Sequence, residues 1–118
     1  MAYRRYNKYG NKKVIVDGIK FDSEAESLRY KELKIMEHQG LIAQLVLQPE
    51  FELLPKFKNC AGKTVQAIRY KADFKYWDVL NKKYVVEDVK GMKTDVYKLK
   101  KKMFEYRYGI PIIEIGEK

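Results

Sequence analysis

The 118-residue sequence is poor in the side chains that many catalytic and metal-cluster sites use. It contains one cysteine, Cys60, and one histidine, His38. These are too few for a disulfide, a zinc cluster or an iron–sulfur cluster within one chain. His38 stands near the expected end of a helix, where it complements the helix dipole, and Cys60 lies in a polar stretch that we interpret as a loop. Catalysis must therefore come from carboxylates and lysines, which favour hard cations such as Mg²⁺ or Mn²⁺.

Long apolar runs are also absent from the sequence. No segment approaches the roughly 20 consecutive apolar residues that cross a bilayer, and the N-terminus shows no apolar signal region. We therefore expect a cytoplasmic protein without a membrane partner.

Positive charge is the feature that the sequence has in excess. It contains 25 Lys and Arg residues against 16 Asp and Glu residues, which gives a formal charge of +9. Such a balance favours a polyanionic partner, because each neutralised phosphate releases condensed counterions. DNA is the partner that we expect. The length fits one hydrophobic core, so the sequence predicts a single domain over residues 14–118.

A basic arm over residues 1–13 precedes that domain. Its arginines Arg4 and Arg5 alternate with tyrosines and show no apolar periodicity. Arginines bind phosphates and tyrosines stack on bases, which favours DNA binding by this arm. A solvated tail is the alternative, because chain termini are commonly disordered.

The first half of the domain shows clear local signals. Asp17-Gly18 between residues 14–16 and 19–21 predicts a tight β-hairpin. Ser23 is a good helix N-cap, and the helix that it begins should end at Gly40. Its expected apolar face consists of Ala25, Leu28, Ile35 and Met36. Residues 42–54 follow as one strand or two, with an edge, a bend or a bulge at Pro49.

The second half predicts further strands and one helix. Residues 55–63 form a polar loop, and residues 67–77 alternate as a strand. Another strand covers residues 84–89. Thr94 caps a second helix that should end at Gly109, before a last strand over residues 110–115. The expected apolar face of this helix consists of Val96, Leu99, Met103 and Tyr106. The order of elements predicts an α+β fold in which helices cover a mixed sheet.

Two aspartates, Asp73 and Asp88, interrupt well-patterned strands, where aspartate is disfavoured. Period-two alternation places Asp88 and Lys90 on one face of their strand and Glu87 on the other. If the turn between the strands holds an even number of residues, Asp73 lies opposite Asp88 or Lys90 on that same face. An odd turn or a bulge would break this parity.

Such a cluster suits phosphodiester hydrolysis. Two carboxylates can hold a divalent cation that polarises a phosphoryl oxygen and lowers the pKa of a bound water. A lysine can orient that water or stabilise the developing negative charge. The alternative is an Asp–Lys ion pair on a solvated sheet face, and spacing alone does not separate the two.

The spacing of Asp73 and Asp88-Val89-Lys90 resembles the D-x(n)-(D/E)-x-K signature of the PD-(D/E)xK nucleases, with Ala72 where the motif name has proline. Nearly the whole chain is similar to a family of small phage-encoded nuclease-like proteins. The segments that carry this similarity are Phe21-Asp22-Ser23, Glu26, Arg29-Tyr30, Gln48, Tyr70-Lys71-Ala72-Asp73-Phe74 and Glu87-Asp88-Val89-Lys90-Gly91. The resemblance implies a restriction-endonuclease-like αβββαβ core, a mixed sheet flanked by helices. That superfamily includes restriction enzymes, Holliday junction resolvases and transposon end-cleaving nucleases, so the fold leaves the substrate open.

The resemblance also implies the members of the site. Glu26, Asp73, Asp88 and Lys90 form the catalytic set, the three acids bind the metal, and Ser23 and Gln48 are accessory residues. Two roles stay open for Glu26, because Ser23-x-x-Glu26 is equally a capping box in which Glu26 bonds the backbone N–H of Ser23. Gln48 is alternatively the polar end of a strand.

Basic residues gather around this set in the sequence. A charge run is usually a solvated helix face, yet lysines beside metal-binding carboxylates would recruit a phosphate backbone. The residues that we expect to bind DNA are Arg4, Arg5, Lys71, Lys75, Lys93, Lys98 and Lys101.

These observations predict a Mg²⁺- or Mn²⁺-dependent DNA endonuclease that leaves a 3′-hydroxyl and a 5′-phosphate, the outcome usual for the superfamily that the chain resembles. Branched DNA such as a Holliday junction is the expected substrate, in phage recombination, replication or packaging in the bacterial host cytoplasm. We expect a homodimer, because two nicks across a junction need two sites. The alternatives are a non-catalytic nucleic-acid-binding protein that retains the nuclease fold and a structural protein with a basic surface.

Overall fold

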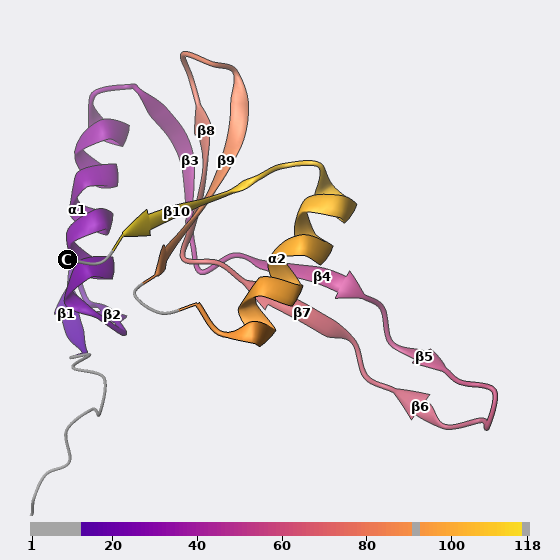
Figure 1. Ribbon diagram of the computed structural model, residues 1–118. Coiled ribbons are helices and arrows are strands. Elements are labelled where there is room, and N and C mark those ends of the chain that lie inside the picture. Colours follow the sequence, from indigo (N-terminus) through magenta and orange to yellow (C-terminus); the bar gives the residue numbers. More distant parts are fainter. Residues whose placement is uncertain (1–12, 91–92, 117–118) are drawn as a thin grey trace, which may run out of the picture.

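The computed structural model describes residues 13–90 and 93–116, which form two helices and ten strands (Figure 1). The fold is α+β, as the sequence predicts. Arg4 and Arg5 of the expected basic arm lie outside the described residues. The elements in chain order are β1 (Val14–Val16), β2 (Ile19–Phe21), α1 (Glu24–His38), β3 (Ile42–Leu47), β4 (Glu50–Leu54), β5 (Phe57–Lys58), β6 (Thr64–Val65), β7 (Ile68–Lys71), β8 (Phe74–Asp78), β9 (Lys83–Lys90), α2 (Asp95–Tyr108) and β10 (Ile112–Gly116).

The predicted N-terminal hairpin is confirmed and lies beside the start of α1 (Figure 1). Asp17 and Gly18 form its turn with φ angles of 54° and 76°, the left-handed conformation that tight hairpins require. The hydroxyl of Tyr30 donates to Asp17 Oδ2 at 3.0 Å, which ties the hairpin to the helix.

A four-stranded mixed sheet in the order β10-β9-β8-β3 forms the centre of the molecule. β3, β8 and β9 are antiparallel neighbours, whereas β10 runs parallel to β9. Phe74 and Tyr76 pack with α1, while Val86 and Ile112 pack with α2. The two helices therefore cover opposite faces of the sheet. The central elements follow one another in the chain as α1, β3, β8, β9, α2 and β10.

β3, β4 and β5 pair with β8, β7 and β6 to form a long antiparallel ribbon that bends once near its middle (Figure 1). The pairing continues through the bend, since Gln48 N donates to Asp73 O at 2.9 Å and Ala72 N donates to Pro49 O at 3.0 Å. Gln48 has a φ of 51°, and Pro49 has no N–H to add to the ladder. The expected bend at Pro49 is confirmed.

This bend corrects the prediction of one regular strand over residues 67–77. β7 and β8 are separate, and the alternating residues of the pattern enter two different cores. Tyr70 and Ala72 pack in the α2 core, whereas Phe74 and Tyr76 pack in the α1 core. The expected loop over residues 55–63 is also only partly correct, because β5 lies within it and pairs with β6.

The helix ends are as predicted. Ser23 Oγ accepts from Glu26 N, and Thr94 Oγ1 accepts from Tyr97 N, both at 3.1 Å. Gly109 ends α2 in the left-handed conformation with a φ of 70°. Caps depend on residues within one turn of each other, which is why the sequence displays them.

The predicted apolar faces of both helices are only partly correct, because Met36 and Met103 pack against the cores while most other members of the two faces are exposed. α1 buries Tyr30 and Leu33, whereas Leu28 and Ile35 of the expected stripe are exposed. α2 buries Tyr97 and Phe104, whereas the members of its expected stripe that lie exposed are Val96, Leu99 and Tyr106. Tyrosines fill the cores because their rings pack while their hydroxyls reach acidic partners. Neither α1 nor α2, the helices in the described parts of the chain, combines the length and apolarity needed to cross a membrane.

Candidate metal-binding active site

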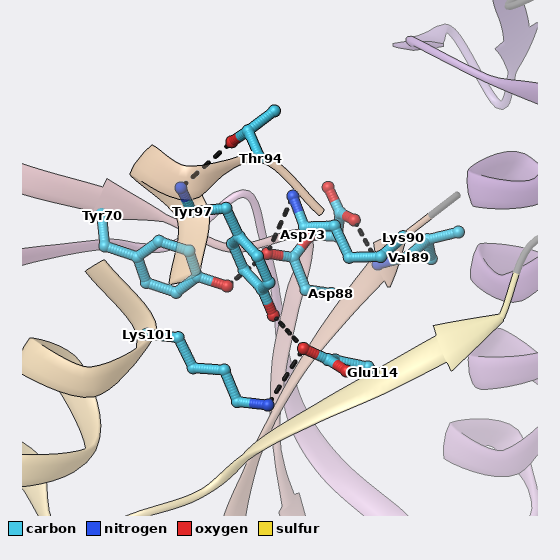
Figure 2. Close-up of polar contacts among 9 residues, drawn as sticks. All are labelled: Tyr70, Asp73, Asp88, Val89, Lys90, Thr94, Tyr97, Lys101 and Glu114. Carbon is cyan, nitrogen blue, oxygen red and sulfur yellow. Dashed lines mark hydrogen bonds and ion pairs between the residues drawn. The ribbon is translucent and has the colours of Figure 1, made fainter. Parts of the chain in front are cut away.

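Asp73 and Asp88 meet where the ribbon bends, beside the start of β8 and the end of β9 in the central sheet. The turn between β8 and β9 spans residues 79–82, which is an even number, so the parity condition of the prediction is met. Phe74 pairs with Glu87, and Asp73 N donates to Glu87 O at 3.1 Å, which places Asp73 opposite Asp88. Figure 2 shows the Asp73 carboxylate beside β9, where its Oδ2 accepts from Val89 N at 2.7 Å.

Asp88 and Glu87 point to opposite faces of β9, as strand alternation predicts. Asp88 is 2% exposed, and its Oδ2 accepts a short hydrogen bond from the Tyr70 hydroxyl. Lys90 Nζ lies 3.5 Å from the same oxygen. Burial, followed by the hydrogen bond to Asp88, raises the pKa of Tyr70 far above its ordinary range, so the hydroxyl stays a donor.

Glu87 is only 1% exposed and belongs to the α1 face. Arg29 Nε and Nη2 donate to its two carboxylate oxygens at 2.8 and 2.6 Å, and the Tyr76 hydroxyl donates at 2.6 Å. The hydrogen bond to Glu87 raises the pKa of Arg29. Both carboxylate oxygens of Glu87 are therefore hydrogen-bonded on the α1 face. Glu87 is not available to the pair formed by Asp73 and Asp88.

A third acid, Glu26, joins the pair from α1. Burial, then the neighbouring carboxyl groups of Glu26 and Asp88, raise the pKa of Asp73 to about 10, and the Val89 N–H opposes this shift. Such a rise means that the ionised form of Asp73 is disfavoured in this buried site unless a cation compensates its charge. Glu26 is itself buried.

The capping role of Glu26 is present as well, with one change of partner. Glu26 Oε1 accepts from Asp22 N at 3.0 Å, rather than from Ser23 N as the capping box predicts. Ser23 uses its hydroxyl to cap α1. Because a carboxylate has two oxygens, Glu26 can cap the helix and still adjoin Asp73.

A family model described as protein of unknown function, DUF1064, matches residues 6–111 of the chain. The chain belongs to the DUF1064 family. No curated protein and no solved structure matches it. The match includes Glu26, Asp73, Asp88 and Lys90, whereas it ends before Glu114 on β10.

In this DUF1064 chain, Gln48 contributes to the site through its backbone. Its N–H binds Asp73 O, and its left-handed φ of 51° makes the bend that brings Asp73 beside β9. Its side chain is exposed. The structure therefore places Gln48 next to Asp73 as a determinant of backbone shape.

Two tyrosines and one glutamate around Asp88 and Lys90 were not predicted from the sequence as members of the site. Tyr70 binds Asp88, and the ring of Tyr97 lies 4.2 Å from Lys90 Nζ. Glu114 on β10 is the direct neighbour of Asp88 in the sheet register. Tyr70 stands within the Tyr70-Lys71-Ala72-Asp73 segment, which offered a signal, whereas Tyr97 and Glu114 carry no local signal.

Two of the lysines expected to bind DNA, Lys93 and Lys101, form ion pairs with Glu114. Lys93 Nζ lies 2.9 Å from the Glu114 carboxylate. Figure 2 shows the other two partners, Lys101 Nζ at 3.0 Å and the Tyr97 hydroxyl, which donates at 2.8 Å. Lys93, Lys101 and Tyr97 lower the pKa of Glu114 to about 2. Of the remaining expected lysines, Lys75 lies over the Tyr84 ring, 4.7 Å from its centroid, and Lys71 and Lys98 are exposed.

The donor set of this DUF1064 site suits a hard divalent cation. Asp73, Asp88 and Glu26 each use one oxygen for the hydrogen bonds described above, and carboxylate oxygens are the ligands that Mg²⁺ and Mn²⁺ prefer. Over residues 13–90 and 93–116, no group of three or more His, Cys, Asp or Glu side chains is already arranged as a metal site. The three acids are therefore adjacent but not a preformed shell, and their mutual repulsion is what a cation would relieve.

Proposed function

We propose that this protein is a metal-dependent DNA endonuclease that hydrolyses phosphodiester bonds in branched DNA such as a Holliday junction. Its setting would be phage DNA recombination, replication or packaging in the bacterial host cytoplasm. The observation that carries the proposal is the convergence of Asp73 and Asp88 at the ribbon bend, with Glu26 beside Asp73 and Lys90 paired to Asp88.

Glu26, Asp73 and Asp88 are the residues that would hold Mg²⁺ or Mn²⁺. Bound there, the cation supplies Lewis-acid polarisation of a phosphoryl oxygen and a bound water of lowered pKa. The residues of the chain do the positioning. Tyr70 fixes Asp88 by donating to Oδ2, and the Val89 N–H fixes Asp73 in the same way.

Lys90 forms an ion pair with Asp88, with 3.5 Å between its Nζ and the Oδ2 of the acid. The Asp88 carboxylate and the Tyr97 ring hold its ammonium group from two sides, which limits the conformations of a long side chain. A positioned ammonium group stabilises the negative charge that develops on a phosphoryl oxygen in the transition state. We assign this role to Lys90.

The fold supports the same proposal. The order α1, β3, β8, β9, α2, β10 of the central sheet agrees with the αβββαβ core that the resemblance implies. Both acids and Lys90 lie at the strand ends of this sheet, where β8 begins and β9 ends (Figure 2). A homodimer would supply the two sites that resolution of a junction needs.

The test is incubation of the full chain with four-way-junction, supercoiled, linear and single-stranded DNA, with Mg²⁺ or EDTA. We expect Mg²⁺-dependent cleavage of the junction that ends in 3′-hydroxyl and 5′-phosphate groups. Asp73→Asn keeps the size of the side chain and is the matched control that should not cleave. Absence of cleavage with both Mg²⁺ and Mn²⁺ would reject the proposal, as would equal cleavage by Asp73→Asn.

A second candidate function is a non-catalytic nucleic-acid-binding protein with the same fold. The Lys90–Asp88 ion pair favours it, because a carboxylate satisfied by lysine and tyrosine has less need of a metal. This candidate predicts salt-sensitive DNA binding without cleavage in the same assay. Isothermal titration with Mg²⁺ separates the two, since only the endonuclease should show a binding heat that Asp73→Asn removes.

A further inference from the structure

The outer end of the bent ribbon is a hairpin that projects from the rest of the molecule. β5 and β6 pair through Phe57 with Val65 and Lys58 with Thr64. Figure 1 shows them reaching past α2, on the side of the molecule away from α1. All residues from 55 to 64 are exposed. No residue of β5 or β6 belongs to either hydrophobic core, so core packing does not account for this extension.

The projecting hairpin carries positive charge without any compensating acid. Lys56, Lys58 and Lys63 lie within residues 55–67, a stretch that contains no Asp or Glu. The ribbon nearer the body is different, because Lys71 pairs in register with Glu50 and Arg69 pairs with Glu52. The uncompensated charge of the ribbon is therefore concentrated at its tip.

The tip has a defined conformation. Asn59 N donates to Lys63 O at 2.9 Å, and Gly62 N donates to Asn59 O at 2.9 Å. Asn59 Oδ1 also accepts from the N–H groups of Ala61 and Lys63 at 2.9 and 3.0 Å. An element that is ordered before binding loses less conformational entropy on docking.

The chemistry of the tip fits nucleic acid. Its lysines suit phosphates, and Phe57 on the same hairpin is 42% exposed, which leaves an apolar ring available for contact. The major groove of B-DNA, about 12 Å wide, admits a two-stranded β-ribbon. Lys63 and Asp73 are ten positions apart along the ribbon, a reach on the order of 30 Å, close to one helical turn of about 34 Å.

We propose that the β5–β6 hairpin docks in the groove of duplex DNA about one helical turn away from the site at Asp73. The distance between the hairpin and the cleaved phosphate rests on the proposed endonuclease function. The binding of the hairpin to duplex DNA does not depend on that function. The hairpin is a binding element separate from the carboxylate cluster. It would hold one duplex arm of a branched substrate while a phosphate near the branch point lies at Asp73.

The experiment compares two variants of the full chain that lose the same charge. K56Q/K58Q/K63Q changes the hairpin tip, and the matched control K20Q/K31Q/K83Q changes exposed lysines on β2, α1 and β9. Affinity for a four-way junction with long duplex arms is measured in EDTA over a range of salt concentrations. Thermal melting checks that both variants fold, which we expect because all six lysines are exposed.

The hairpin variant should lose at least tenfold in affinity at low salt. Its slope of log K against log salt should be shallower by about 2 to 3, since each lost phosphate contact removes about 0.9. The control should lose less than threefold. Hydroxyl-radical footprinting should show protection about one turn from the branch point that disappears only in the hairpin variant.

Equal losses in the two variants would show a general charge effect and overturn the proposal. So would unchanged affinity in the hairpin variant, or a loss for single strands with none for duplex. Because binding is measured in EDTA, failure to cleave in Mg²⁺ rejects the endonuclease function and leaves the hairpin result standing. Normal cleavage by a hairpin variant with unchanged duplex binding rejects the hairpin alone.

Discussion

Partly buried Arg29 on α1 and fully buried Glu87 on β9 are joined by hydrogen bonds of 2.8 and 2.6 Å, although 58 positions separate them in the sequence. The Tyr76 hydroxyl donates a further hydrogen bond to Glu87. This arrangement holds Glu87 on the face of the sheet opposite Asp88. Two adjacent acids therefore have separate roles, one in stability and one in the candidate site.

Glu87→Ala should destabilise the protein by about 1 to 3 kcal/mol, because it leaves the buried Tyr76 hydroxyl without its acceptor and the partly buried Arg29 with only the exposed Glu32. Asp88→Ala should remain folded and lose Mg²⁺-dependent junction cleavage. Chemical denaturation measures the first effect and single-turnover cleavage measures the second. If Glu87→Ala unfolds, Glu87→Gln gives the milder test and should retain cleavage. A folded, inactive Glu87→Gln beside an active Asp88→Ala would contradict the roles.

Asp73→Asn should stabilise the metal-free protein at neutral pH while abolishing cleavage. The raised pKa of Asp73 means that folding favours the protonated carboxyl. Its contribution to the free energy of unfolding is therefore present below the ordinary pKa of 3.8 and is lost as pH rises toward about 10. The neutral amide of the Asp73→Asn variant avoids this loss of stability. Thermal melting at pH 7 should show a higher Tm for Asp73→Asn in EDTA, and Mg²⁺ should raise the Tm of the wild type only. A lower Tm for the variant in EDTA would argue against repulsion among the acids.

Tyr70→Phe should lower cleavage by about 10- to 100-fold, since it removes the hydrogen bond that orients a metal-binding carboxylate. The ring stays packed near Phe51, Tyr97 and Phe104, so the fold should persist. The matched control is Tyr108→Phe, whose hydroxyl donates to the Glu52 carbonyl at 2.7 Å, on the ribbon beyond the bend. Dependence of the rate on Mg²⁺ concentration is the measurement, and equal rates for the two variants would contradict the role of Tyr70.

Glu114→Gln should destabilise the protein at neutral pH and have little effect near pH 2. Lys93, Lys101 and Tyr97 lower the Glu114 pKa from 4.5 to about 2, so its stabilising contribution is present above pH 4.5 and disappears as pH falls toward 2. Urea denaturation midpoints at pH 7, 4 and 2.5 should show a difference from wild type that shrinks with pH. A difference that stays constant over this range would mean that packing, rather than charge, makes Glu114 stabilising.

The sequence by itself determined the local features of this protein. The Asp17-Gly18 turn, the Ser23 and Thr94 caps and the Gly109 terminus each depend on residues a few positions apart. The relation between Asp73 and Asp88 was predictable for a similar reason, because it needs only strand alternation and an even turn. Period two is a property of the backbone, so it survives without knowledge of the rest of the fold.

Only the tertiary structure decided which helix faces are buried, where the ribbon bends and which partners surround the site. Tyr30 and Tyr97 are buried on the two helices because Asp17 and Glu114, acceptors distant in sequence, bind their hydroxyls. The Arg29–Glu87 pair and the place of Glu114 beside Asp88 depend on α1 and β10 packing against β9. Such contacts join segments far apart in the chain, and no local pattern of residues encodes them.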